Sequence, residues 1–275
     1  MPVIATNTAA NSALRYLNLN SSTESGITSK LASGSRITKA SDDASGLAIG
    51  TRIQSDVTVL TQASTNASQG TAILQTADGG LARISDILQR MKSLATQSNS
   101  GSVTNNERTY INSEYTQLSS EITGIAQSTR YNGVSLLDGT GVYATGVDFM
   151  VGTSTSDTIN VKIAAADSTS LAIDTSSVDT QANAQTAIGL LDTAIASVSS
   201  DRASVGASMS RFDFRSQQIA TSSENLSAAE SAVMDADVAS EKSKLASADV
   251  KAQAAIAALS QANQMPQELL SLLKG

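Results

Sequence analysis

The chain has 275 residues and a formal net charge of −7, and its 40% hydrophobic content includes only 3% aromatic residues. It contains no histidine and no cysteine. Their absence excludes Ser-His-Asp catalysis, thiol nucleophiles, disulfides and thiolate or histidine metal sites, so neither an enzyme nor a cofactor is expected. Acidic and basic residues are interspersed without a run of Lys or Arg, which argues against nucleic acid or an anionic membrane as partner.

The amino-terminal segment lacks both a basic region and an apolar core of seven or more residues, so no cleaved signal peptide is expected. No stretch approaches the roughly 18 consecutive apolar residues of a membrane span. The only prolines are Pro2 and Pro266, and the chain between them is free of the strongest helix breaker. Long helices are therefore permitted. Pro266 is expected to kink or interrupt a carboxyl-terminal helix, unless the residues before it already end that helix.

A heptad stripe of apolar and small residues predicts a first long helix. Its main column comprises Ile53, Leu60, Ala67, Leu74, Leu81, Leu88 and Ala95. Asp42 or Asp43 is the candidate N-cap, a more probable role for these adjacent carboxylates than a cation site. The polar stretch near Gly101 marks the end, so the helix has about 50 residues and a length of roughly 75 Å.

The next segment begins with Thr104 and Glu107, which have the spacing of a capping box. A second, shorter helix is predicted from there to the turn at Asn132-Gly133. Between residues 137 and 179 the periodicity changes to two, which predicts a pair of half-buried strands joined by a polar loop. Their inward-facing residues are Val147, Phe149 and Val151 on one strand and Ile159, Val161 and Ile163 on the other. This β-hairpin is the only convincing strand signal.

The seven-residue column then returns and predicts a third long helix that packs against the first. Its members are Ala184, Leu191, Val198, Val205, Phe212, Ile219, Leu226 and Val233. Small residues at Ala67, Gly70, Ala77 and Gly206 are expected to permit close helix approach.

The residue patterns at both chain ends predict amphipathic helices that have no obvious partner in the middle of the chain. Their apolar residues are Val3, Ile4, Leu14, Leu17, Ile27 and Leu31 at one end and Leu245, Ile256, Leu259, Leu269, Leu270 and Leu273 at the other. Pairing with one neighbouring helix leaves about half of the apolar surface of each end in contact with water. The ends are therefore expected to be ordered only among other subunits. The sequence thus predicts self-assembly through the inner terminal helices.

Several fragments, in this order, resemble bacterial flagellin. They are LASGSRITKASDDASGLAIGTRI, QRMKSLATQS, RYNGVSLLDG, FMVG with TINVKI, LDTAIASVSSDRASVGASMSRFD, NLSAAESAVMDADVA and LSQANQMPQELLSLLKG. The resemblance covers both ends and most of the chain between them. Fewer than about 30 residues separate the hairpin from the third helix, which leaves no room for a large outer variable domain.

The resemblance implies a mainly α fold, namely an elongated bundle or coiled coil of long helices with a small β-hairpin region and paired N- and C-terminal helices. It divides the chain into 1–42, an inner helix with a connecting spoke; 43–178, the first part of the outer helical domain; 179–234, the returning long helix of that domain; and 235–275, the second inner helix.

The function implied is that of a structural subunit of the flagellar filament for swimming motility, outside the cell after export through the flagellum's own type III pathway. The partners implied are many copies of itself, with paralogous flagellins among them, a flagellar export chaperone, and hook-associated and cap proteins. The alternative is a hook-filament junction protein with flagellin-like ends. A flagellin with an inserted peptidase is excluded because its metal motif needs histidine.

Some flagellins are recognised by the vertebrate toll-like flagellin receptor. The residues that resemble the recognised surface are Gln89, Arg90, Leu94, Gln97 and Glu114. Lys92-Ser93 departs from the pattern, since a basic-acidic pair is usual there. In the alternative interpretation, Leu94 faces a neighbouring subunit and the polar residues are solvated or make lateral contacts.

The Ser- and Thr-rich stretch 153–180 is a candidate for O-glycosylation, because related filaments are often decorated at exposed hydroxyls of this region. The hydroxyls considered first are those of Thr153, Ser154, Thr155 and Ser156. Unmodified polar loops are the alternative.

Overall fold

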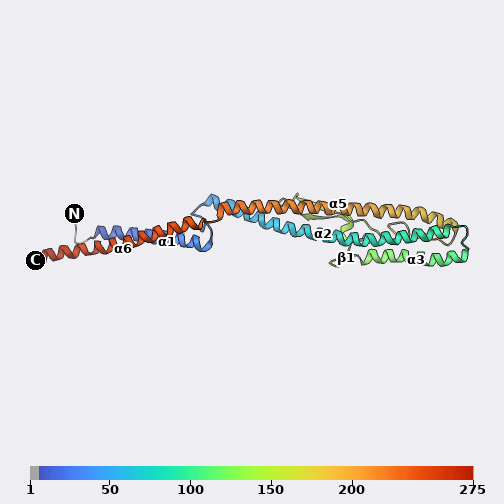
Figure 1. Ribbon diagram of the computed structural model, residues 1–275, viewed down its shortest axis with the longest axis horizontal. Coiled ribbons are helices and arrows are strands. Elements are labelled where there is room, and N and C mark those ends of the chain that lie inside the picture. The colour runs from blue at the N-terminus through green and yellow to red at the C-terminus, as the bar shows by residue number, and fades with distance from the viewer. Residues whose placement is uncertain (1–5, 275) are drawn as a thin grey trace. The chain divides into compact units, whose positions relative to one another are not determined.

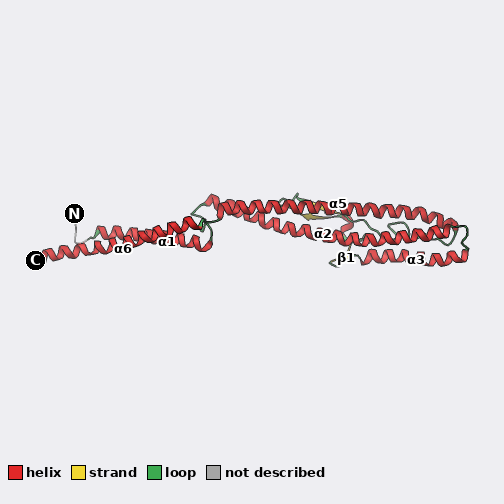
Figure 2. Ribbon diagram, in the orientation of Figure 1, coloured by secondary structure: helices red, strands yellow, loops and turns green. Residues whose placement is uncertain are grey.

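A computed structural model describes the backbone of residues 6–274 and the side chains of residues 6–266. Within these bounds the chain is mainly α-helical, with two small antiparallel hairpins (Figures 1 and 2). The elements in order are α1 (Thr8–Ser33), α2 (Ala44–Asn99), α3 (Asn105–Ser128), β1 (Arg130–Tyr131), β2 (Val134–Ser135), α4 (Val142–Thr145), β3 (Val147–Met150), β4 (Thr158–Val161), α5 (Gln181–Met234) and α6 (Val238–Lys274). None of the described helices is long and apolar enough to cross a bilayer.

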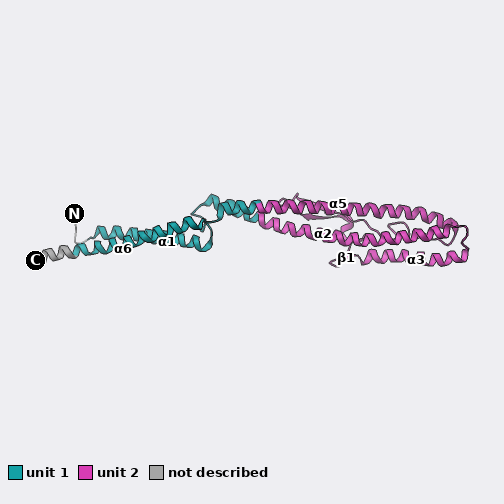
Figure 3. Cartoon of the chain, viewed as in Figure 1, with its two compact units in different colours: residues 1–55, 225–275 teal, residues 56–224 magenta. Residues whose placement is uncertain are grey.

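The chain forms two compact units (Figure 3). Residues 1–55 and 225–275 make up what we call the terminal unit, in which α1 and α6 pack along each other (Figure 1). Residues 56–224 make up the central unit, which holds most of α2 and α5, all of α3 and both hairpins. The predicted fold class, long helices with paired chain ends and a small β region, is confirmed.

The helix α2 begins where the sequence offered two N-cap candidates, and the cap is Asp43. Its Oδ1 accepts the backbone N–H of Gly46 at 2.8 Å, the bond that defines a helix N-cap. Asp42 instead braces the preceding turn, where one carboxylate oxygen accepts the backbone N–H groups of Thr38 and Lys39. The two adjacent carboxylates are therefore used as local backbone acceptors.

The core of the central unit lies between the facing stripes of α2 and α5. Both heptad columns are buried along this unit, with side chains at most 5% exposed: Leu60, Ala67, Leu74, Leu81, Leu88 and Ala95 on α2, and Ala184, Leu191, Val198, Val205, Phe212 and Ile219 on α5. Tyr115 and Ile122 of α3 join them, both 0% exposed. The heptad spacing that the sequence shows is thus the spacing of the packed seam.

The two outermost core candidates, Ile53 and Leu226, are only half-buried, which corrects their assignment to the packed core. Both belong to the terminal unit, and the described part of that unit contains no residue of α3 or of the hairpins. A stripe covered by a single helix keeps part of its surface in water.

The widest part of the core is built around the ring of Phe212. A Cβ atom at Gly70 would lie 2.5 Å from Cζ of Phe212, so glycine is what lets the ring approach α2. Phe149 of β3 meets the ring edge-on, with centroids 5.7 Å apart and an interplanar angle of 88°. Gly206 differs from Gly70, because nothing lies within 4 Å of a Cβ placed there. The predicted close approach at Gly206 is wrong.

The predicted hairpin is β3 with β4, in antiparallel register with Val147 opposite Val161 and Phe149 opposite Ile159. The structure adds a second hairpin, β1 with β2, which the sequence interpretation missed. Its two-residue turn is Asn132-Gly133, both with positive φ, of 49° and 80°. That conformation is typical of a type I′ turn and is the reason for Asn-Gly at this position. The sequence interpretation took Asn132-Gly133 only as the turn that ends the preceding helix; just two residues pair on each side of it.

The capping box at the start of α3 is present as predicted. Thr104 receives the backbone N–H of Glu107, whose carboxylate accepts the Thr104 backbone N–H at 2.7 Å and its hydroxyl at 2.8 Å. These bonds, chiefly the one from the backbone, hold the pKa of the exposed Glu107 below its ordinary value of 4.5.

This lowered pKa makes the stability of α3 depend on pH. Because the pKa of Glu107 is lower in the folded than in the unfolded chain, its contribution is present above pH 4.5 and is lost as the pH falls through the folded pKa. We expect Glu107→Gln, which stays neutral, to lose less stability than the wild type between pH 6 and pH 3. Urea midpoints at both pH values measure this, and equal losses in the two chains would contradict it.

The buried side chain of Arg108 stabilises the turn between α2 and α3 through hydrogen bonds. The residue is only 6% exposed, and its guanidinium donates to the carbonyls of Ser98 at 2.8 Å and Ser100 at 3.0 Å and to the side chain of Asn105 at 2.9 Å. One side chain therefore satisfies acceptors at the end of one helix and the start of the next.

We expect Arg108→Met, which keeps much of the side-chain volume, to destabilise the central unit by roughly 2–3 kcal/mol, because it leaves the buried carbonyl of Ser98 without this donor. Denaturant unfolding followed by circular dichroism measures the effect. Arg83→Met is the matched control, since the Arg83 side chain is 78% exposed and its loss should change stability by about 0.5 kcal/mol or less. Equal effects of the two substitutions would show that burial of Arg108 is unimportant.

Candidate assembly surface

The terminal unit is organised around a junction where the two halves of the chain meet again. Gly34, in the left-handed conformation with φ 70°, ends α1. Backbone bonds then join the two connectors, from the N–H of Arg36 to the carbonyl of Met234 at 2.7 Å and from the N–H of Ala236 to the carbonyl of Gly34 at 2.9 Å. The guanidinium of Arg36 also donates to the carbonyl of Val233 at 2.7 Å. These bonds hold the connector that follows α1 against the connector that precedes α6.

The first turn of α6 is capped by Asp237, whose Oδ1 accepts the backbone N–H groups of Ala239 at 2.9 Å and Ser240 at 3.1 Å. Glu241 follows with 8% exposure and contacts Lys244, with 2.6 Å between Oε1 and Nζ. A carboxylate in the first turn also interacts favourably with the helix dipole. The buried charge is thus compensated on its own helix.

Small side chains form the α6 side of the seam between α1 and α6. On α6 the buried positions recur every seven residues, at Ala248, Ala255 and Ala262, with exposures of 5%, 8% and 6%. On α1 the buried apolar residue is Ile27, at 8%. Alanine brings two helix backbones close together but removes little apolar surface from water. The pairing of the chain ends therefore leaves most of their large apolar side chains outside it.

Both helices also carry large apolar side chains that are exposed outside this seam, and we call this set of residues the outer apolar face. Its members, with exposures of 46–65%, are Leu14, Tyr16, Leu19, Val238, Val250, Ile256 and Met265. Of the residues predicted for self-assembly, Leu14 and Ile256 belong to this face, Leu17, Leu31, Leu245 and Leu259 are half-buried, and Ile27 is buried. Val3 and Ile4, and the side chains of Leu269, Leu270 and Leu273, lie outside the described residues.

The sequence interpretation did not include Tyr16, Leu19, Val238, Val250 and Met265 among the residues of self-assembly. The alanine column of α6 was the available signal, since a seven-residue repeat of a small residue indicates a close helix contact. The face opposite that column is then the free one.

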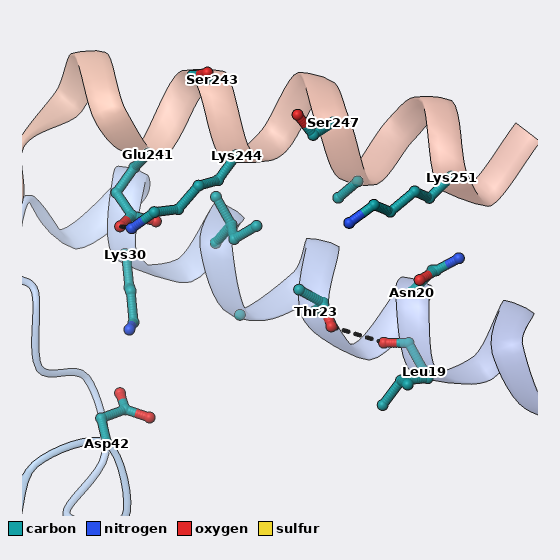
Figure 4. Close-up of a pocket in the computed structure, with 13 residues that line it drawn as sticks. Leu19, Asn20, Thr23, Lys30, Asp42, Glu241, Ser243, Lys244, Ser247 and Lys251 are labelled. Carbon is teal, nitrogen blue, oxygen red and sulfur yellow. Dashed lines mark hydrogen bonds and ion pairs between the residues drawn. The ribbon is translucent and has the colours of Figure 1, made fainter.

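A shallow groove of about 740 Å³ runs between α1 and α6 near the junction (Figure 4). Lys30, Lys244 and Lys251 line it together with Asp42 and Glu241. In Figure 4 the Lys244 side chain extends toward Glu241. The groove combines charged rims with the exposed side chain of Leu19, a composition suited to contact with another protein surface.

Four of the five residues that resemble the receptor surface lie on the accessible face of the central unit. Gln89 and Gln97 are exposed, and Arg90 contacts Glu114 across α2 and α3, with 2.7 Å between nitrogen and carboxylate oxygen. Leu94 is only 2% exposed, so it belongs neither to a receptor surface nor to a contact with a neighbouring subunit. α2 is covered by both α3 and α5 here, and its buried stripe is consequently wider than a two-helix seam.

The four hydroxyl residues considered for glycosylation form the tip of the β3–β4 hairpin, and all four are exposed: Thr153, Ser154, Thr155 and Ser156. Asp157 holds this loop, through its carboxylate, which accepts the backbone N–H of Ser154 at 3.2 Å. Ser168, in the same Ser- and Thr-rich stretch, is 9% exposed and accepts or donates a bond with Thr123 at 2.7 Å. That hydroxyl is not accessible for modification.

Paired chain ends with an outer apolar face, and a separate long-helix unit packed through heptad seams, are the features of a helical protein that associates with other chains. Family models agree with this class: residues 4–141 match the bacterial flagellin N-terminal helical region and residues 188–273 match the bacterial flagellin C-terminal helical region. The chain belongs to the bacterial flagellin family.

Similar proteins cover nearly the whole chain. Flagellin of Halalkalibacterium halodurans is 35% identical over 99% of this chain and 100% of its own length. The flagellar filament 30.7 kDa core protein of Treponema maltophilum is 34% identical over 98% and 99%. The lengths match closely, which agrees with a short form that lacks large outer domains.

Among solved structures, Bacillus cereus flagellin is 32% identical, with a TM-score of 0.51, over 56% of this chain and 88% of that one. A candidate flagellar hook-associated protein of Vibrio parahaemolyticus has a TM-score of 0.58 over 70% of this chain and 99% of that one, at 14% identity. The second likeness shows the fold alone.

Proposed function

We propose that this chain is a structural subunit that polymerises into the bacterial flagellar filament through the outer apolar face of α1 and α6. The observation that carries this function is the exposure of Leu14, Tyr16 and Ile256, at 46%, 55% and 56%, on a helix pair in which the buried apolar positions of α6 are alanines. Water contact with so many large apolar groups is unfavourable, and packing against further copies removes it. No catalytic role belongs to this function.

Assembly of the purified chain tests the proposal. After addition of a precipitating salt, negative-stain microscopy should show long tubes, and limited proteolysis should cut both chain ends in the subunit but not in the tubes. A compact monomer with both ends protected, which forms no tubes under any salt condition, would refute it.

The hook-filament junction protein is the competing assignment. Two matching flagellin family models and relatives called flagellin over nearly the full chain favour the filament. Isolated flagella distinguish the two, because a filament subunit is their most abundant protein whereas a junction protein is present in few copies.

The same function includes further proposals. The chain is placed outside the cell in the filament after export through the flagellar type III pathway, with an export chaperone, hook-associated and cap proteins, and other flagellins as partners. The four segments 1–42, 43–178, 179–234 and 235–275 remain a prediction about its arrangement in the filament. Chain ends that become ordered only on assembly are compatible with export of the chain in an unfolded state.

Receptor recognition and glycosylation are separate proposals. The accessible pair of Arg90 and Glu114 supports the first, and binding of purified subunit to the receptor ectodomain should weaken in Arg90→Ala; no difference at micromolar concentration removes it. The exposed loop 153–156 supports the second, and an intact mass equal to that of the polypeptide rules it out.

A further inference from the structure

Pro266 creates a defined gap in the backbone hydrogen bonding of α6. In an α-helix the N–H of each residue donates to the carbonyl four positions earlier. Proline has no N–H, so the carbonyl of Ala262 lacks its usual helical donor. α6 nevertheless continues from Val238 to Lys274 through Pro266, so of the predicted kink or interruption the interruption is wrong.

Asn7, at the opposite end of the sequence, supplies a donor to that carbonyl. Its Nδ2 lies 2.7 Å from the carbonyl oxygen of Ala262, a residue only 6% exposed. Its Oδ1 accepts the backbone N–H of Ala10 at 3.0 Å, which makes Asn7 the N-cap of α1. Because the capping bond requires the oxygen on that side, the amide group must present its NH₂ to Ala262. Both halves of one side chain are therefore used.

We propose that Asn7 is a positioning residue that sets the register of α1 against α6 by replacing the N–H that Pro266 lacks. Carbonyls inside a helix normally accept a backbone N–H, and proline leaves Ala262 as a distinct acceptor. On α6 the buried alanines repeat every seven residues, so the α6 side of the seam presents a similar surface after a shift along the repeat. The bond from Asn7 to Ala262 singles out one register.

The consequence concerns which apolar side chains reach the outer face. A shift of α1 by one turn would move Leu14 and Tyr16 relative to Ile256 on the surface available to other copies. This consequence rests on the proposed polymerisation, whereas the register itself concerns the pairing of α1 with α6 within one subunit.

A double-mutant cycle tests the proposal in the full chain, both unassembled and polymerised. The four chains are the wild type, Asn7→Ser, Pro266→Ala and the double variant. Serine caps a helix as well as asparagine but is too short to reach Ala262, and alanine at 266 restores the missing N–H. Hydrogen exchange of peptides 8–20 and 255–266 reports local opening. Asn18→Ser, at an exposed position of α1, is the control.

We expect Asn7→Ser to speed exchange of both peptides about five-fold, the effect of a single hydrogen bond, in the wild-type background and to have no such effect once residue 266 is alanine. If Asn7→Ser speeds exchange equally in both backgrounds, Asn7 acts only as the N-cap of α1. If it changes exchange in neither background, Asn7 does not stabilise the helix pair. Either result overturns the proposal. So does exchange of both peptides at the unfolded rate in every form.

The cycle separates this proposal from the function. A wild type that forms no filaments but shows the coupling in the unassembled chain refutes polymerisation and supports the register. A wild type that forms filaments but shows no coupling between Asn7 and Pro266 supports polymerisation and refutes the register.

Discussion

Ile256→Asp is expected to abolish filament formation at concentrations where the wild type polymerises. Ile256 is 56% exposed on the outer apolar face of α6, so an aspartate there is well solvated in the single chain. Burial of the carboxylate against apolar side chains of neighbouring copies costs several kcal/mol. We expect the critical concentration to rise by about 100-fold or more, since each 1.4 kcal/mol is a factor of ten.

The measurement is sedimentation of salt-induced polymer over a range of subunit concentrations. Ile256→Leu is the matched variant, because it keeps an apolar side chain of nearly the same volume, and it should assemble. The unfolding midpoint of the central unit should be unchanged in both. Normal polymerisation of the aspartate variant would show that Ile256 is not in a subunit contact.

Phe212→Ala is expected to have the largest effect on the stability of the central unit. The ring is 0% exposed, meets Phe149 edge-on at 5.7 Å and fills the space left by Gly70. Removal of a fully buried aromatic ring from a packed core costs roughly 3–5 kcal/mol. That is a large part of the 5–15 kcal/mol that stabilises a typical domain.

Urea unfolding compares this variant with Phe214→Ala, two residues further along α5. Phe214 is 72% exposed, and its removal should change the free energy of unfolding by about 0.5 kcal/mol or less. If Phe212→Ala does not fold, Phe212→Leu gives a smaller loss in the same direction. Similar effects at the two positions would show that the ring of Phe212 is not in the core.

The sequence was most informative where a structure depends on residues close together in the chain. The heptad columns gave α2 and α5, Thr104 with Glu107 gave the start of α3, and strict alternation gave the β3–β4 hairpin. Each signal is local, because a cap, a strand face and a helix stripe are all set by spacings of a few residues. The resemblance to flagellin rested on short sequence fragments in a fixed order and was sufficient to predict the family.

Local patterns failed where burial depends on how many neighbours an element has. Leu94 is buried because α3 and α5 both cover α2 at that point, while Ile53 and Leu226 stay half-exposed at the ends of their columns. Arg108 is buried because three acceptors converge on it from two helix ends and their connecting turn. From the sequence alone, a charged residue such as Arg108 is expected at the surface.

By itself, the sequence determined the long helices, their order and the capping box of α3, since these follow from periodicity and short-range hydrogen bonding, and its resemblance to known fragments determined the family. Only the tertiary structure decided which face of the terminal helices is left free, because alanine and leucine columns are both compatible with an amphipathic helix until a partner is placed. It also brought Asn7 to Ala262, a contact between residues 255 positions apart that no local spacing encodes.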